Sequence, residues 1–208
     1  MSPARILAAN DPASLQIALE LLQQGQLVAF PTDTIYGLGA DLRNPQAIQQ
    51  LYEVKGRDAA KAIAVLVGSP KALDEITAGI SPIAQRLAQH FWPGPLTLVV
   101  PAHPSLPPEL SPSPTVGVRM PDHTDALALL NLTGPLAVTS ANLSGAPSSV
   151  TAQEVFEQIG EHIPLILDGG KTPGGLPSTV LDCTRDEIKI LRVGPISQAE
   201  LEAALGKR

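Results

Sequence analysis

The sequence predicts an α/β or α+β fold built on a mixed β-sheet, and three observations lead to this prediction. Short apolar runs, several of them β-branched, alternate with segments of helical periodicity along the whole chain. Hydrophobic residues make up 44% of the 208 residues, which excludes general disorder. The 17 glycines and 21 prolines mark many sharp turns between elements. No linker divides the chain, so we expect one domain over residues 1–208.

Eight apolar runs are typical of buried strands, because most are four to six residues long and bounded by turn residues. They span residues 27–30, 62–67, 96–100, 116–118, 135–138, 163–167, 179–181 and 188–193.

The predicted helices begin at recognisable capping residues. A side chain that can cap a helix precedes a proline at Asp11-Pro12, Asn44-Pro45, Ser69-Pro70 and Ser81-Pro82. Two further helices are predicted where a hydroxyl lies three residues before a glutamate, at Thr151 and Glu154 and at Ser197 and Glu200. The stretch 101–114 holds six prolines and predicts a stiff loop, either a surface connection or a flap over a site.

Charge and composition exclude several classes of function. The net charge of -6 and the pI of about 5.1 argue against a protein that coats nucleic acid. No apolar run approaches the roughly 18 residues of a membrane helix, and the first ten residues do not form a secretory signal. A single cysteine excludes a disulfide framework. We therefore expect a soluble cytoplasmic protein.

Hydroxyl-bearing side chains follow a predicted strand in the segment FPTDTIYGLGAD, residues 30–41. Open α/β sheets place ligands at such strand ends, and Gly37 and Gly39 would let a ligand approach the backbone. A polar turn that bonds only to its own backbone is the alternative. The segment PLAVTSANLSGAPSS, residues 135–149, leaves the same choice open, with Ser140 and Asn142 as an i, i+2 pair.

Cations are scarce in this chain, and three of them, Lys55, Arg57 and Lys61, fall within seven residues. If the first two lie on an extended segment, they point to the same side and suit a polyphosphate. A solvated charge cluster that closes a helix is the alternative. Arg119 lies near the end of an apolar run, and a buried arginine there needs an anionic partner, either a protein carboxylate or a substrate carboxylate or phosphate. Arg192 is another cation that closes an apolar strand.

Several other kinds of functional site are rejected because the residues that they require are missing. Gly170-Lys171-Thr172 is not a P-loop, because Leu165 replaces the required glycine and Pro173 follows. The four histidines are too scattered to bind a metal together. Cys183 is expected to be inert packing, and no serine nucleophile motif is present.

Seven segments in order give the chain a specific resemblance. They read PTDTIYGLGAD, KGR, PGPLTLVV, TVGVRMP, TSANLSG, STVLD and ILRVG. Together, from about residue 13 to 194, they resemble the YrdC-like family of threonylcarbamoyl-AMP synthases. The resemblance implies a twisted mixed sheet with flanking helices around a concave, cationic cavity.

The resemblance also implies an activity. Such proteins join L-threonine, bicarbonate or CO2, and ATP, with Mg²⁺, to give L-threonylcarbamoyl-AMP and pyrophosphate. A separate transferase then modifies tRNA with the threonylcarbamoyl group. The reaction concentrates negative charge and uses the carbamate as its nucleophile. It therefore needs positioned cations more than a catalytic triad.

The family's functional residues fall on defined positions of this sequence. The residues of its KxR and SxN motifs correspond here to Lys55, Arg57, Ser140 and Asn142, and the resemblance implies that they are catalytic. Its threonine contacts are Thr34, Arg119 and Ser178. Its nucleotide contacts are Arg57, Lys61, Thr115, Asn142, Ser149 and Arg192. No protein ligand to Mg²⁺ is expected.

Three departures from the family pattern stand out. Asp58 replaces a proline that usually follows the KGR motif, and Leu66 replaces a histidine found near the threonine in long members. The chain stops at residue 208, so it resembles the short form.

Two alternative functions remain. One is the carbamoyl-adenylate module of hydrogenase-maturation carbamoyltransferases, against which the absence of zinc-finger cysteines counts. The other is an RNA-binding module. The negative net charge and only six aromatic residues (one Trp, two Tyr and three Phe) predict weak or no direct RNA binding. No membrane partner is expected.

Overall fold

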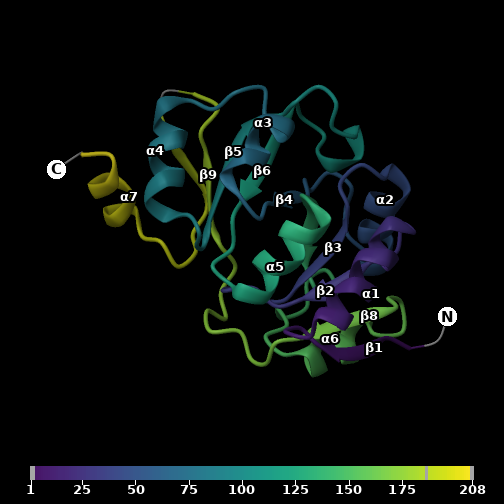
Figure 1. Cartoon of the computed structure of the whole chain (residues 1–208). Coiled ribbons are helices and arrows are strands. Elements are labelled where there is room, and N and C mark those ends of the chain that lie inside the picture. Colours follow the sequence, from purple (N-terminus) through teal and green to yellow (C-terminus); the bar gives the residue numbers. More distant parts are fainter. Residues whose placement is uncertain (1–2, 186, 207–208) are drawn as a thin grey trace.

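The computed structural model describes residues 3–185 and 187–206, which form one ten-stranded mixed β-sheet with helices on both faces (Figure 1). The strands are β1 (Arg5–Ala8), β2 (Val28–Phe30), β3 (Gly37–Asp41), β4 (Ala64–Leu66), β5 (Leu96–Pro101), β6 (Thr115–Arg119), β7 (Leu136–Ser140), β8 (Leu165–Asp168), β9 (Thr179–Asp182) and β10 (Lys189–Arg192). The helices are α1 (Pro12–Gln23), α2 (Pro45–Lys55), α3 (Leu73–Ile76), α4 (Pro82–Phe91), α5 (Thr124–Thr133), α6 (Ala152–Ile159) and α7 (Gln198–Ala204), with 3₁₀ turns η1 (Pro70–Ala72) and η2 (Pro108–Leu110).

The sheet combines parallel and antiparallel pairs, as the sequence predicts. Its strand order is β1-β8-β2-β3-β7-β4-β6-β5-β9-β10. β8 runs parallel to both β1 and β2, β4 to β6, and β5 to β9, whereas the remaining neighbours are antiparallel. All eight predicted strands are present.

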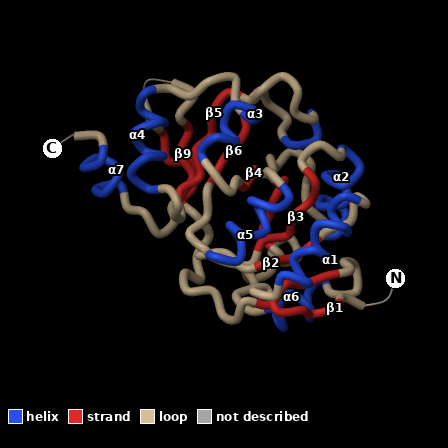
Figure 2. The backbone as a smooth tube through the Cα atoms, in the orientation of Figure 1, coloured by secondary structure: helices blue, strands red, loops and turns tan. Residues whose placement is uncertain are grey.

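Side chains alternate between two cores because successive strand residues point to opposite faces of the sheet. In β2, Val28 and Phe30 pack with α1 and α5, while Ala29 packs on the other face, where α2, α4, α6 and α7 lie. In Figure 2 the helices flank the strands on both sides of the sheet. Leu66 and Val138 belong to the α1–α5 core and also line a cavity, so the cavity continues the sheet face that these helices leave uncovered.

Capping side chains start most helices where the sequence predicts them. Asp11 accepts a hydrogen bond from the Ala13 amide at 3.0 Å, and Asn44 accepts one from the Ala47 amide at 3.1 Å. The prediction at Ser69-Pro70 is wrong in part. Ser69 makes no capping bond there, and the segment forms only η1 and the single turn α3.

Three described strands and α-helices have no counterpart in the predictions: β1, β3 and α5. The 3₁₀ turn η2 lies in the stretch predicted to be a loop. β3 escapes prediction because its sequence, GLGAD, lacks strand-forming side chains. Its glycines make room for neighbours instead. A Cβ at Gly37 would lie 2.9 Å from Val138 Cγ1, and one at Gly39 would lie 2.9 Å from Phe30 Cε1. Among the described residues, no helix is both long and apolar enough to cross a membrane.

Cys183 follows β9 and is only 1% exposed, as expected of a packing residue. Burial, and then the negative charge of Asp182, raises the pKa of its thiol to about 12.

We predict that Cys183 resists iodoacetamide in the folded protein at about pH 8. At that pH the raised pKa keeps the thiol protonated, and the thiolate is the reactive form. Mass spectrometry should show no label on the native chain and complete labelling in denaturing guanidinium chloride. Rapid labelling of the native chain would contradict this burial.

Candidate active site

A cavity of about 450 Å³ opens on the sheet face beside α5. Seven of the eleven residues that the sequence assigns to a site line it: Thr34, Arg57, Thr115, Arg119, Ser140, Ser178 and Arg192. Residues from widely separated parts of the chain thus meet in one hollow. The other four, Lys55, Lys61, Asn142 and Ser149, do not line it.

β6 runs along the floor of the cavity with every second residue facing inward. Thr115, Gly117 and Arg119 all line the cavity, as the strand period requires. A Cβ at Gly117 would lie 3.2 Å from Thr97 Cγ2, so the middle of the floor is kept flat. The strand therefore presents a hydroxyl near one end and a guanidinium near the other, on residues whose Cα atoms are about 13 Å apart at ~3.3 Å per residue.

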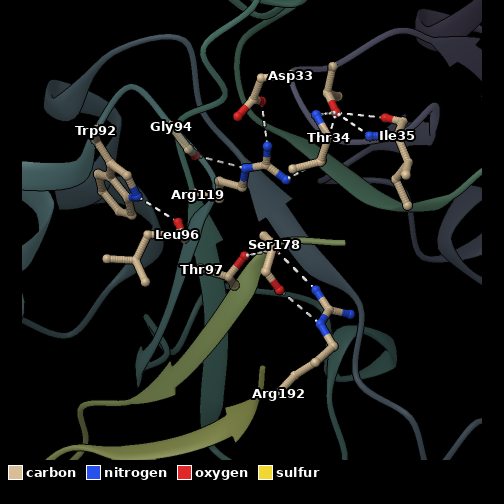
Figure 3. Close-up of polar contacts among 11 residues, drawn as sticks. Asp33, Thr34, Ile35, Trp92, Gly94, Leu96, Thr97, Arg119, Ser178 and Arg192 are labelled. Atoms are coloured by element: carbon tan, nitrogen blue, oxygen red, sulfur yellow. Dashed lines mark hydrogen bonds and ion pairs between the residues drawn. The ribbon is translucent and has the colours of Figure 1, made fainter. Parts of the chain in front are cut away.

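The Arg119 guanidinium is buried, with 6% of the residue exposed, and each of its nitrogens has a partner (Figure 3). Nε donates to Gly94 O at 3.0 Å and Nη1 donates to Thr34 Oγ1 at 2.9 Å, while Nη2 forms an ion pair with Asp33. Burial lowers the pKa of Arg119, and the Asp33 carboxylate opposes that shift. Asp33 is thus the protein carboxylate that a buried arginine needs. Two of the five N–H groups of Arg119 remain available to donate to a ligand.

A hydroxyl turn sets the position of Thr34. Thr32 Oγ1 donates to Ile35 O at 2.6 Å and accepts from the Thr34 amide at 3.2 Å. Thr32 and Thr34 are both buried, and their hydroxyl oxygens lie 3.0 Å apart. The sequence leaves two interpretations of this segment, a ligand site or a polar turn bonded to its own backbone. The structure shows a turn that bonds to its own backbone and also lines the cavity.

Ser178 and Arg192 form a second polar group on the cavity wall (Figure 3). Arg192 Nε donates to Ser178 O at 2.9 Å and Nη2 donates to Ser178 Oγ at 3.0 Å. Ser178 Oγ also lies 2.8 Å from Thr97 Oγ1. Burial, and then the charges of Arg119 and Arg57, lowers the pKa of Arg192, so the three guanidinium groups act on one another.

The cavity is positively charged although the chain is acidic overall. Arg57, Arg119 and Arg192 line it, and none of its described lining residues is an aspartate or a glutamate. Clustered cations in a partly desolvated hollow repel one another and attract anions. The arrangement can therefore bind carboxylate and phosphate groups.

The segment from Lys55 to Arg57 is not extended. The condition under which the sequence predicts that both cations point to the same side is therefore not met. α2 ends at Lys55, and Gly56 adopts a left-handed conformation with φ 57° and ψ 39°. Beyond this turn, Arg57 faces the cavity, with Nε donating to Lys61 O at 3.3 Å and Nη2 to Ala62 O at 3.0 Å.

Lys55 is buried behind the cavity wall. Its ammonium donates to the carbonyl oxygens of Ser140 and Asn142 and lies 3.4 Å from Ser140 Oγ. Burial, and then the charge of Arg57, lowers the pKa of Lys55 to about 8. In this structure Lys55 fixes the turn that carries Ser140, and direct contact between Lys55 and a phosphate stays a prediction.

The remaining predicted residues lie around the same turn or at the rim. Asn142 is buried and donates from Nδ2 to Leu143 O and Ala146 O at 2.8 and 2.9 Å, while its Oδ1 has no hydrogen-bond partner among the residues that the structure describes. Ser149 is buried and donates to Ala141 O at 2.9 Å. Lys61 is exposed. Two residues depart from the family pattern. Leu66, in place of a histidine, lines the cavity, and Asp58, in place of a proline, is exposed in a turn.

Sequence reasoning missed some residues of the site, chiefly Thr97, Ser111 and Ser113, which line the cavity, and Asp33, which pairs with Arg119. The serine hydroxyls continue the inward face of β6, with Ser113 Oγ 2.8 Å from Thr115 Oγ1 and 3.1 Å from Ser111 Oγ. Their spacing of two residues before Thr115 is the signal that could have identified them. The proline-rich stretch 101–114 therefore borders the cavity at its C-terminal end.

No group of three or more metal-binding side chains occurs in the residues that the structure describes, taking His, Cys, Asp and Glu as candidate ligands. The polar groups of the cavity are guanidinium and hydroxyl groups, which suit anions rather than cations.

Comparison with known proteins gives consistent matches. Residues 20–194 match the family Sua5/YciO/YrdC, described as telomere recombination. The chain is 42% identical to the threonylcarbamoyl-AMP synthase of Bacillus subtilis, over 96% of this chain and 58% of that protein. It is 40% identical to a putative threonylcarbamoyl-AMP synthase of Mycobacterium tuberculosis, over 91% and 88%.

Solved structures show the same fold. The structure of Pyrococcus abyssi Sua5 complexed with L-threonine superposes with a TM-score of 0.94 at 38% identity, covering 98% of this chain and 62% of that one. Escherichia coli YciO superposes with a TM-score of 0.86 at 24% identity, over 97% and 100%, and this likeness concerns the fold alone. The chain spans less than two thirds of the length of the Bacillus and Pyrococcus relatives.

Two ion pairs of contrasting burial test the anchoring of Arg119. The side chains of Arg119 and Asp33 are 7% and 11% exposed, whereas those of Arg43 and Glu75 are 76% and 59% exposed. Asp33→Ala should lower the free energy of unfolding by about 3–5 kcal/mol, because it leaves a buried cation without its counter-charge. Glu75→Ala, the matched control, should cost at most about 1 kcal/mol.

Urea denaturation of both variants measures the difference. Equal losses of stability in the two variants would show that the Asp33 pair does not hold Arg119 in place.

Proposed function

The chain belongs to the Sua5/YciO/YrdC family, and from that premise we propose that it is an L-threonylcarbamoyl-AMP synthase. It would form L-threonylcarbamoyl-AMP and pyrophosphate from L-threonine, bicarbonate or CO2, and ATP, which makes it a nucleotidyltransferase. The observation that carries the proposal is the convergence of Arg57, Arg119 and Arg192 on one cavity whose lining holds no described carboxylate. Relatives with this name, and a relative bound to L-threonine, support it.

The amino acid would bind at the Arg119 end of β6. The free N–H groups of Arg119 can hold its carboxylate, and the hydroxyls of Thr34 and Ser178 line the same cavity and can meet its polar groups. Asp33 and Gly94 hold the guanidinium still, so little conformational freedom would be lost on binding.

The nucleotide would extend toward the Thr115 end of β6. Arg57 and Arg192 line the cavity and can neutralise its phosphates, with Lys61 available from the exposed rim. The hydroxyls of Ser140 and Thr115 can donate to phosphate or ribose oxygens. Lys55, Asn142 and Ser149 would support this end by fixing the chain around Ser140.

The chemical step needs positioning and charge more than proton transfer. A carbamate oxygen of N-carboxythreonine would attack the α-phosphorus, and the bond from that phosphorus to the α–β bridging oxygen would break. Pyrophosphate leaves with the electron pair, and the developing negative charge is stabilised by the arginines. Mg²⁺ would enter with ATP, and we assign no protein ligand to it.

The product would pass to a separate transferase that modifies tRNA to threonylcarbamoyladenosine. We propose the cytoplasm as the site of action, since ATP, free threonine and tRNA are found together there.

The direct test is pyrophosphate release by the purified chain supplied with Mg-ATP, bicarbonate and L-threonine. Release should require all three substrates. Arg57→Ala should lower the rate at least about 100-fold, because it removes a charge that acts on the transition state. Arg86→Ala, an exposed arginine on α4, is the matched control and should keep the wild-type rate.

Two results would reject the proposal. One is pyrophosphate release that does not depend on threonine. The other is a wild-type rate in the Arg57→Ala variant.

A further inference from the structure

The chain has two tyrosines, and both are buried with their hydroxyls bonded to loops that border the cavity. Tyr36 is 0% exposed and precedes β3, and Tyr52 is 8% exposed on α2. Burial raises the pKa of both phenols, so each hydroxyl keeps its proton and can donate. A phenylalanine at either position would fill nearly the same space as the tyrosine. The specific contribution of each tyrosine is therefore the hydrogen bonding of its hydroxyl.

The Tyr36 hydroxyl anchors the start of the connection between β8 and β9. It donates to Gly170 O at 2.8 Å, accepts from the Gly169 amide at 3.3 Å, and lies 3.3 Å from Asp168 Oδ1. The connection, residues 169–178, links two strands that lie far apart in the sheet order (Figure 1).

This connection passes over the amino-acid end of the cavity. The Gly175 amide donates to Thr34 O at 2.8 Å, and a Cβ at Gly174 would lie only 2.7 Å from Asp33 O. The connection then ends at Ser178, which faces the cavity. Tyr36 therefore holds a segment that touches Asp33 and Thr34, the partners of Arg119, and that delivers Ser178.

The Tyr52 hydroxyl anchors two segments at the opposite end. It lies 3.0 Å from Glu109 O and 3.3 Å from Lys61 O, so it can donate to either carbonyl. Lys61 O also accepts from Arg57 Nε, and the Ile63 amide donates to Leu110 O at 2.8 Å. Tyr52 thus joins the loop that carries Arg57 to the proline-rich stretch that leads to Ser111 and Ser113.

We propose that Tyr36 and Tyr52 are positioning residues that set the two ends of the cavity independently, Tyr36 the amino-acid end and Tyr52 the nucleotide end. The assignment of substrates to the ends rests on the proposed function. The independence follows from the contacts of the hydroxyls themselves, which share no bonding partner among the described residues. The two ends do meet where Arg192 donates to Ser178, and this contact involves neither tyrosine.

Kinetics of Tyr36→Phe and Tyr52→Phe test the proposal, each variant serving as the matched control for the other. A lost hydrogen bond of this kind corresponds to about a 2- to 13-fold effect. Tyr36→Phe should raise KM for L-threonine by that factor and leave KM for ATP within about 2-fold. Tyr52→Phe should do the reverse, and the effects should combine independently in the double variant.

Hydrogen exchange gives a readout that does not need activity. Tyr36→Phe should speed amide exchange in residues 169–177 and not in residues 57–63 or 109–113, and Tyr52→Phe should show the opposite pattern. Lower thermal stability with unchanged KM values, equal changes in both KM values, or the same exchange pattern in both variants would overturn the proposal. If the wild-type chain itself releases no pyrophosphate with threonine, the proposed function fails, and the exchange pattern still decides whether the hydroxyls act separately.

Discussion

The burial of the Arg119 guanidinium is the constraint on which the site depends. A cation at this depth is tolerated only where its donors are satisfied and its charge is opposed. Asp33, Thr34 and Gly94 meet both needs, and they come from the turn after β2 and from the segment before β5. Satisfying one arginine therefore brings together the chain segments that form the amino-acid end of the cavity.

The remaining cations extend this positive field along the cavity. Arg192 is held by Ser178, and Arg57 by the carbonyls of its own loop, so both charges are fixed by neutral oxygens that leave them uncompensated. An acidic chain thereby keeps a local site for anions, and like charges held close together favour an anionic ligand. This agrees with a reaction that gathers a carboxylate, a carbamate and a triphosphate.

Local features of the sequence predicted much of the fold. Capping residues such as Asp11 and Asn44 and the apolar runs act over a few residues, so six helix starts and eight strands could be placed, with only short turns at Ser69-Pro70. β3 was missed because its two glycines have little preference for strands, although they make room there for side chains of β2 and β7. α5 was missed because His123, at its N-cap, makes no capping bond.

Site residues were harder to place than strands, because their orientation depends on tertiary contacts. The resemblance to the family motifs selected Arg57, Arg119 and Arg192 as site residues, and all three line one cavity. It could not show that the left-handed Gly56 turns Arg57 away from Lys55, or that Lys55 bonds to carbonyls 85 residues further along the chain. Asp33 was passed over because its partner, Arg119, lies 86 residues away in sequence.

A crystal structure of the chain grown with L-threonine and a non-hydrolysable ATP analogue would place both substrates relative to the three arginines. We expect the threonine carboxylate within hydrogen-bonding distance of Arg119 and the phosphates between Arg57 and Arg192. Ligand bound away from these guanidinium groups, or phosphates contacting none of them, would contradict this expectation.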